Sequence, residues 1–339
     1  MRAPPFPELE ALEAVIALGG SRLDARVACE VETPQGRFPV YVVTLGNPHP
    51  SAAVFGVFGG VHGIERIGAV VAIACLRSVV ARLRWDALLL RLLESVRLVF
   101  MPMVNPGGLS LGTRANPRGI DLMRNAPVEC DQKATFLIGG QRLGAWLPWY
   151  RGPEDGPMEA ESQALCEVVG SEVLSHDFAL TLDCHSGFGL EDRIWFPHAH
   201  TRRPVPHLPE LLALCELFDD THPQHRYVVE PQSRQYLAHG DLWDYLYLKA
   251  CESPQRVLLP LTLEMGSWIW VKKNPLQLLS LDGIFNPLIR HRQQRVLRRH
   301  AVLLDFLMRA AASDRAWRPS APERTVLHER ALHRWYRAR

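Results

Sequence analysis

Two residues with the chemistry of metal ligands stand three positions apart: His62 and Glu65. They lie between an apolar run over residues 52–58, which ends in a pair of glycines, and a helix-like run over Ile67–Val80. This order predicts a buried strand, a tight turn and a helix. Because residues three apart at a helix start share one face, the imidazole and the carboxylate can hold one cation. Imidazole and carboxylate are ligands that zinc takes in proteins, and a catalytic zinc needs a third protein ligand, so the pair alone does not define a site.

A second pair with the same spacing, His207 and Glu210, occurs in a proline-rich stretch over residues 203–209. No predicted strand leads into it, and Pro209 lies between the two residues. We expect a solvated turn at this pair rather than a metal site.

Further candidates follow other predicted strands. His185 comes directly after the apolar run Phe178–Cys184, and Glu264 lies near the end of the run Arg256–Met265. Strand-end loops of α/β enzymes meet at one edge of the sheet, where they assemble sites from distant parts of the chain. A carboxylate in so apolar a run is costly unless it is paired or acts as an acid or base. His185 alone could equally be a hydrogen-bonded histidine at a strand end.

A loop rich in glycine and proline, residues 112–127, carries three arginines: Arg114, Arg118 and Arg124. Guanidinium groups in such a loop suit the binding of an anionic group or a developing oxyanion. Taken without the other motifs, they could simply serve surface solubility.

Alternating strand and helix patterns run through the chain and predict a single α/β domain. Residues 1–312 form the predicted domain. Residues 313–339 form a basic segment, for which a solvated tail or a strap across the domain is favoured over contact with an acidic partner. The predicted strands are Arg26–Glu32, Arg37–Gly46, Ala52–Phe58, Val96–Met103, Phe178–Cys184, Arg226–Glu230 and Arg256–Met265. The predicted helices are a short one that begins at Pro7 and ends just before Gly19, and Glu65–Arg82, Ala87–Ser95, Met158–Ser175, Leu208–Phe218, Leu242–Lys249 and Ile289–Ala312.

The composition indicates which kinds of binding partner and which cellular compartment to expect. A formal net charge of +2 over 339 residues gives no field that favours nucleic acid or a membrane. No apolar run is long enough to span a bilayer, and acidic residues interrupt what would have to be the core of a signal peptide. Seven cysteines without a CxxC pair indicate reduced thiols. We therefore expect a cytoplasmic protein.

In order, these motifs are His-x-x-Glu, an arginine-rich loop ending in Asp-Leu-x-Arg-Asn, His-Ser, a tyrosine, and a glutamate at a strand end. The ordered set resembles the zinc carboxypeptidase (carboxypeptidase A-like) family over residues 20–312. The loop over residues 112–127 looks most like the bacterial branch that includes the murein peptide amidases, cytosolic enzymes that trim cell-wall peptides. The resemblance implies one domain with a mixed, mostly parallel, twisted sheet and helices on both faces.

The resemblance also implies roles at the metal. His62, Glu65 and His185 match the ligands of a single zinc ion per chain. Glu264 matches the general base, and Asp121 matches the carboxylate that orients the first zinc histidine.

For the substrate, the resemblance implies a small peptide with an anionic end. Arg114 matches the arginine that polarises the scissile carbonyl, and Arg124 matches the one that binds the terminal carboxylate. Tyr236 falls where the family keeps its mobile tyrosine, with Tyr245 and Tyr247 as weaker candidates.

One position departs from the family. Met123 stands where an asparagine usually precedes the carboxylate-binding arginine, and its thioether cannot donate a hydrogen bond. Recognition of a free carboxylate then depends on Arg124 and Tyr236, or the substrate offers a different group.

The resemblance implies zinc-dependent hydrolysis of an amide bond near a peptide C-terminus. Two other functions stay open: hydrolysis of N-acyl amino acids, as in aspartoacylase and desuccinylase relatives, and zinc or peptide binding without catalysis. A serine or cysteine hydrolase built on Ser186 or Cys184 is disfavoured because the chain has no Gly-x-Ser-x-Gly elbow.

Overall fold

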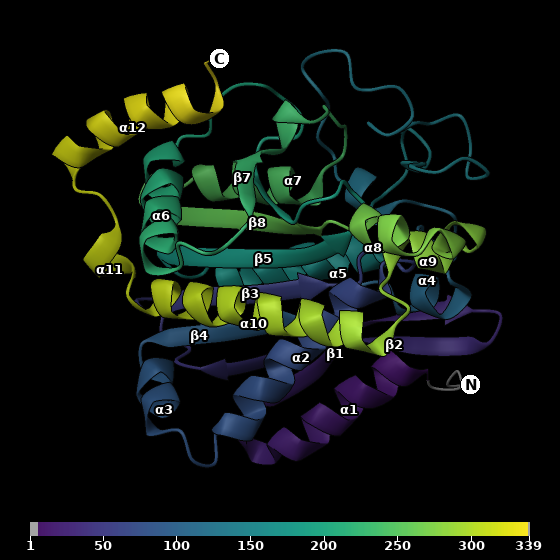
Figure 1. The fold of residues 1–339 in the computed structure, drawn as a ribbon, viewed down its shortest axis with the longest axis horizontal. Helices are drawn as coiled ribbons and strands as arrows, with labels where there is room; N and C mark the ends of the chain where they lie inside the picture. Colours follow the sequence, from purple (N-terminus) through teal and green to yellow (C-terminus); the bar gives the residue numbers. More distant parts are fainter. Residues whose placement is uncertain (1–5, 338–339) are drawn as a thin grey trace.

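Eight strands form one mixed sheet in the computed structural model of the protein, which describes residues 6–337 (Figure 1). Their order is β1-β2-β4-β3-β5-β8-β6-β7, and four of the seven neighbouring pairs are parallel. The strands are β1 (Asp24–Thr33), β2 (Gly36–Gly46), β3 (Ala53–Gly59), β4 (Val96–Met101), β5 (Phe178–Ser186), β6 (Arg193–Phe196), β7 (Val228–Pro231) and β8 (Val257–Met265). The predicted α/β class and mostly parallel sheet are confirmed.

Helices cover both faces of the sheet because alternate strand residues point to opposite sides. In β3, Phe55 and Val57 belong to one core cluster, whereas Val54 and Phe58 belong to the other. The first cluster is closed by α1 (Pro7–Gly19), α2 (Arg66–Arg82), α6 (Leu208–Thr221) and α10 (Arg290–Ala312). The second is closed by α5 (Ala160–Val168) and α7 (Leu242–Cys251).

Several short elements were not predicted from the sequence. They are the strand β6 and the helices α4 (Pro106–Leu111), α8 (Trp268–Lys273) and α9 (Leu281–Phe285). Each is at most six residues long, too short for a periodic pattern to stand out. The helix α3 spans Ala87–Leu93, close to its expected bounds.

The C-terminal segment contains two helices, α11 (Asp314–Trp317) and α12 (Ala321–Trp335). Figure 1 shows α12 lying beside α6, and the two helices are in contact. Ala331 and Trp335 of α12 are buried in the first core cluster. This segment therefore packs across the domain instead of forming a solvated tail, although residues 338–339 lie outside the described part of the chain.

The expected solvated turn at His207 and Glu210 is wrong, because both side chains are buried at the start of α6. His207 Nδ1 lies 2.9 Å from the hydroxyl of Tyr247, and Glu210 forms an ion pair with Arg324 of α12. Helix α12 covers His207 and Glu210, and its Arg324 is the ion-pair partner of the Glu210 carboxylate. Tyr247 accordingly packs here, away from the strand-end site.

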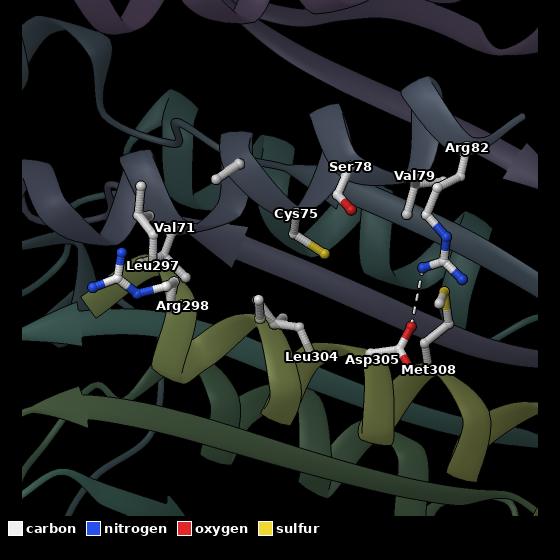
Figure 2. A pocket seen from close by; sticks show the side chains of 12 residues that line it. Val71, Cys75, Ser78, Val79, Arg82, Leu297, Arg298, Leu304, Asp305 and Met308 are labelled. Carbon is white, nitrogen blue, oxygen red and sulfur yellow. Dashed lines mark hydrogen bonds and ion pairs between the residues drawn. The ribbon is translucent and has the colours of Figure 1, made fainter. Parts of the chain in front are cut away.

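A groove separates α2 from α10 on the first face of the sheet (Figure 2). Arg82 and Asp305 close one end with an ion pair of 3.0 Å. Cys75 lies in this groove, and burial raises the pKa of its thiol to about 12.

All seven cysteines are unpaired. Within residues 6–337, none of the helices combines the length and the apolar character needed to cross a membrane.

Candidate active site

The candidate residues meet at one edge of the sheet because β3, β5 and β8 are adjacent and parallel. His62 follows β3, Glu65 directly precedes α2, and His185 of β5 lies opposite Glu264 of β8. The first turn of α2 approaches β5 so closely that only glycine fits at residue 68: a Cβ there would be 2.1 Å from a backbone oxygen of β5.

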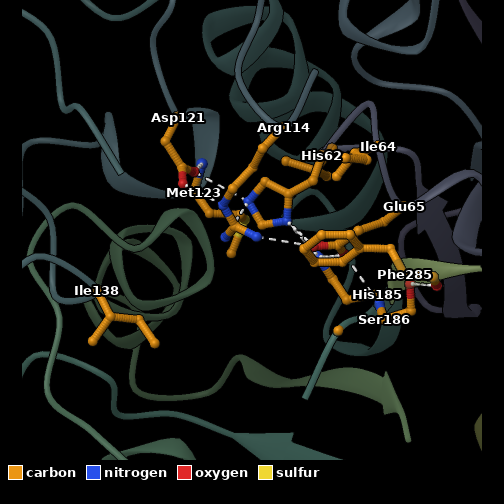
Figure 3. A network of polar contacts seen from close by, with 12 residues as sticks. His62, Ile64, Glu65, Arg114, Asp121, Met123, Ile138, His185, Ser186 and Phe285 are labelled. Atoms are coloured by element: carbon orange, nitrogen blue, oxygen red, sulfur yellow. Dashed lines mark hydrogen bonds and ion pairs between the residues drawn. The ribbon is translucent and has the colours of Figure 1, made fainter. Parts of the chain in front are cut away.

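Three buried side chains face one another at this edge: His62, Glu65 and His185 (Figure 3). Nδ1 of His62 lies 3.0 Å from Oε1 of Glu65, and Nδ1 of His185 lies 3.2 Å from Oε2. The two Nδ1 atoms are 3.2 Å apart. Zinc bonds of about 2.0–2.1 Å in a tetrahedron give ligand separations of about 3.3 Å. The donor set and its spacing therefore fit zinc.

The outer nitrogen of each histidine contacts a carboxylate. Nε2 of His62 lies 3.1 Å from Asp121, and Nε2 of His185 lies 2.8 Å from Asp183. In His185, a proton on Nε2 that is donated to Asp183 leaves the Nδ1 lone pair for a metal. Nε2 of His62 faces both Asp121 and an N–H of Arg114, whose Nη2 lies 2.9 Å away. Asp121 thus lies beside His62, and its role toward a metal stays a prediction.

Asp183 was not predicted from the sequence. It is fully buried, and its Oδ2 also accepts a hydrogen bond from the indole of Trp243 at 2.9 Å. The available signal was its position two residues before His185, which puts both side chains on the same side of a strand.

Arg114 joins Asp121 to the metal ligands. Its Nε donates to Asp121, and its Nη1 donates to Glu65, both at 2.9 Å. Burial works to raise the pKa of the Asp121 carboxyl, but Arg114 and His62 hold it well below its usual range. Burial likewise works to lower the pKa of the Arg114 guanidinium, and the neighbouring carboxylates raise it. Arg114 therefore stays cationic beside the candidate metal ligands.

Glu264 faces the same pocket without ligating. Burial, followed by the nearby charge of Glu65, raises the pKa of Glu264 to about 8. A carboxyl whose pKa lies near neutrality can both accept and donate a proton.

Arg124 and Tyr236 form the opposite wall of the pocket. The buried guanidinium donates to the carbonyls of Ile138 and Met123 at 3.1 and 3.0 Å, and Nη2 lies 3.4 Å from the Tyr236 hydroxyl. These contacts use three of the five guanidinium N–H groups, so two remain for a ligand. Met123 is also buried on this wall.

Tyr245, a weaker candidate, lies away from this wall. It is half-buried on α7, and Lys249 Nζ lies 4.5 Å from its ring centroid.

The solved structures show the same fold. Bovine thrombin-activatable fibrinolysis inhibitor, in complex with tick carboxypeptidase inhibitor, is 18% identical with a TM-score of 0.62, covering 90% of this chain and 94% of that one. Carboxypeptidase A from Helicoverpa armigera is 16% identical with a TM-score of 0.65, covering 89% of this chain and 71% of that one.

Sequence comparisons identify the family. Carboxypeptidase SOL1 of Arabidopsis thaliana is 31% identical over 93 residues, which is 26% of this chain and only 19% of that relative. The family model described as zinc carboxypeptidase matches residues 28–267, most of the chain and all of the site described above. The chain therefore belongs to the zinc carboxypeptidase family, a family of hydrolytic enzymes.

Proposed function

We propose that the protein hydrolyses the amide bond near the C-terminus of a small peptide, with one zinc ion per chain, and that cell-wall-derived peptides are among its substrates. The observation that carries this proposal is the convergence of His62, Glu65 and His185 beside Glu264 at the edge of the sheet. The family of the chain supports the reaction class.

His62, Glu65 and His185 would hold the zinc ion, which would supply Lewis acidity to a water molecule and to the scissile carbonyl. Glu264 accepts a proton from that water on its carboxylate and delivers it to the leaving amine. Asp121 and Asp183 keep the ligating nitrogens of the two histidines deprotonated and fix the orientation of their rings.

Arg114 and Arg124 take different anionic groups. Arg114, fixed by Asp121 and Glu65, stabilises the negative charge that develops on the carbonyl oxygen. Arg124 offers its two remaining N–H groups to the terminal carboxylate of the substrate, with the Tyr236 hydroxyl alongside.

Met123 reduces the hydrogen bonding available to that carboxylate. Its backbone N–H donates to Asp121, its carbonyl accepts from Arg124, and its thioether offers the pocket no donor. One missing charge-assisted hydrogen bond costs about 1.5–3 kcal/mol. We propose that Arg124 and Tyr236 suffice for binding at this reduced strength.

Metal analysis and turnover of a peptide panel test the proposal. The panel contains α-linked peptides, γ-D-Glu-linked cell-wall peptides and N-acyl amino acids. We expect about one zinc per chain, and in Glu264→Gln a loss of kcat of about a thousandfold or more with the zinc retained. Glu252→Gln, which alters an exposed carboxylate at the end of α7, serves as the control.

Each contrary result has a distinct meaning. Full activity of Glu264→Gln would refute the assigned base. Turnover of N-acyl amino acids alone would favour the amidohydrolase alternative, and peptide binding without turnover would favour a non-catalytic zinc protein.

A further inference from the structure

One segment at the surface reverses the usual placement of polar and apolar side chains. Gln277 is buried in the short turn between α8 and α9, whereas its apolar neighbours are between 60% and 84% exposed. These neighbours are Leu276, Leu278, Leu279 and Leu281, here called the leucine patch. Single apolar residues on a surface need no explanation, but a group of adjacent ones marks a surface that binds an apolar partner.

Buried hydrogen bonds hold these leucines on the outside. The side-chain amide of Gln277 donates to the carbonyls of Gly283 and Asn286 at 2.8 and 3.1 Å, and its oxygen accepts from Arg292 of α10 at 3.2 Å. The side chain of Asn286 in turn donates to the carbonyl of Ile64 at 2.7 Å, in the turn that carries the first two candidate ligands. The leucine patch is therefore fixed to the part of the chain that builds the candidate active site.

Two more contacts place the leucine patch at the same edge of the sheet as that site. The half-exposed Trp268, at the start of α8, donates its indole N–H to the carbonyl of Gly187 at 3.0 Å. The carbonyl of Phe285, at the end of α9, accepts from the hydroxyl of Ser186 at 2.8 Å. A partner bound to the leucine patch therefore lies beside the candidate active site.

Positive charge surrounds the leucine patch. Residues 268–299 contain seven lysines and arginines but a single acidic residue, Asp282, whereas the whole chain has a net charge of only +2. Figure 1 shows α8, α9 and the start of α10 together at one end of the molecule. The expectation that no field favours a membrane came from the net charge of the whole chain, and that value understates the charge of this region.

Most of these cations can bind an external anion. Five of the seven are exposed and form no side-chain ion pair or hydrogen bond within residues 6–337: Lys272, Lys273, Arg290, Arg295 and Arg298. In a symmetric contact between two copies of the chain, the same patch meets itself, so these cations would repel one another. A membrane with anionic lipids instead offers an apolar layer to the leucines and negative charge to the cations.

We propose that the leucine patch and the cations around it bind the protein to the surface of a membrane that contains anionic lipids. The leucine side chains enter the boundary between head groups and acyl chains, while the lysines and arginines contact the lipid phosphates. Binding of this kind lies on the membrane surface and needs no spanning helix. The inference goes beyond the proposed function, because it concerns where the protein acts and not which bond it cleaves.

Co-sedimentation of the full-length protein with lipid vesicles tests the proposal. Vesicles of phosphatidylcholine alone are compared with vesicles that also contain phosphatidylglycerol. The wild type should bind the phosphatidylglycerol vesicles about tenfold more tightly or better, and added salt should weaken this binding. The double variant Lys272→Gln/Lys273→Gln should bind them about 10- to 30-fold more weakly than the wild type. Leu279→Gln/Leu281→Gln should weaken the binding about tenfold or more.

Matched variants near α3, at the opposite end of the molecule in Figure 1, provide the controls. Arg84→Gln/Arg91→Gln removes two exposed positive charges, and Leu88→Gln/Leu90→Gln replaces two exposed leucines. Both control proteins should bind vesicles as the wild type does. Far-UV circular dichroism shows whether each variant is folded.

Three results would overturn the proposal. The first is a wild type that binds neither kind of vesicle or binds both equally, and the second is a folded leucine variant that binds as tightly as the wild type. The third is a wild-type dimer that the leucine variant converts to a monomer, without vesicle binding, which would assign the leucine patch to a second copy of the chain. Vesicle binding is measured without peptide turnover, so this inference and the proposed function can fail separately.

Discussion

Replacing Asp183 by asparagine tests whether this carboxylate strengthens zinc binding by His185, the second histidine of the proposed zinc site. In the wild type, Oδ2 of Asp183 accepts from His185 Nε2 at 2.8 Å and from Trp243 Nε1 at 2.9 Å. An amide oxygen can occupy the same position, so both hydrogen bonds and the shape are kept while the negative charge is lost. The imidazole then becomes a weaker donor to the metal.

The expected magnitude follows from the outer-shell role of this carboxylate. Loss of such a partner costs about 10- to 100-fold in metal affinity, or about 1.4–2.7 kcal/mol at 25 °C. Because zinc binds only the folded site, the same amount should disappear from the unfolding free energy of the zinc-loaded protein at a fixed excess of zinc. The metal-free protein should change much less.

Competition with a chelator measures the zinc affinity, and urea unfolding with and without zinc measures the two stabilities. Asp305→Asn is the matched control, since its carboxylate pairs with Arg82 far from the site. Equal zinc affinity in the wild type and Asp183→Asn would refute the reasoning. So would an equal loss of stability with and without zinc, because that result would make Asp183 a purely structural residue.

Three further predictions concern binding, pH and packing. Arg124→Lys keeps the positive charge but loses the planar guanidinium that binds a carboxylate through two hydrogen bonds. For peptides with a free C-terminus, kcat/KM should therefore fall about 10- to 100-fold. An equal fall on C-terminally amidated peptides would refute the role of Arg124 in binding the terminal carboxylate. Burial lowers the pKa of His300 to about 4, so this histidine must stay neutral in the fold and its contribution to stability is lost as the pH falls from about 6.5 to 4. Urea unfolding should show the stability difference between wild type and His300→Gln shrinking over that range by about 3 kcal/mol, and a constant difference would contradict the prediction. Gly68→Ala places a Cβ 2.1 Å from the carbonyl oxygen of Cys184 and should destabilise the fold by about 1–3 kcal/mol, whereas Gly170→Ala, which meets nothing within 4 Å, should not.

The sequence by itself determined the sheet strands that carry the site and the chemistry at their ends. The apolar runs before His62, His185 and Glu264 were long enough to be recognised as buried strands. Parallel neighbours then bring their C-terminal ends to one edge, so the convergence of these residues followed from local patterns and general sheet geometry. The proposed roles of Arg114, Arg124 and Tyr236 came from the family resemblance rather than from local patterns.

Only the tertiary structure decided which polar groups are paired. Asp183 is recognised as the partner of His185 once Trp243, sixty residues later, closes over it. The burial of Glu210 depends on Arg324, more than a hundred residues away. The position of α9 likewise depends on Asn286, whose side chain donates to the carbonyl of Ile64, more than two hundred residues earlier. Hydrogen bonds and ion pairs between distant segments depend on register and covering layers, which leave no periodic signal in the chain.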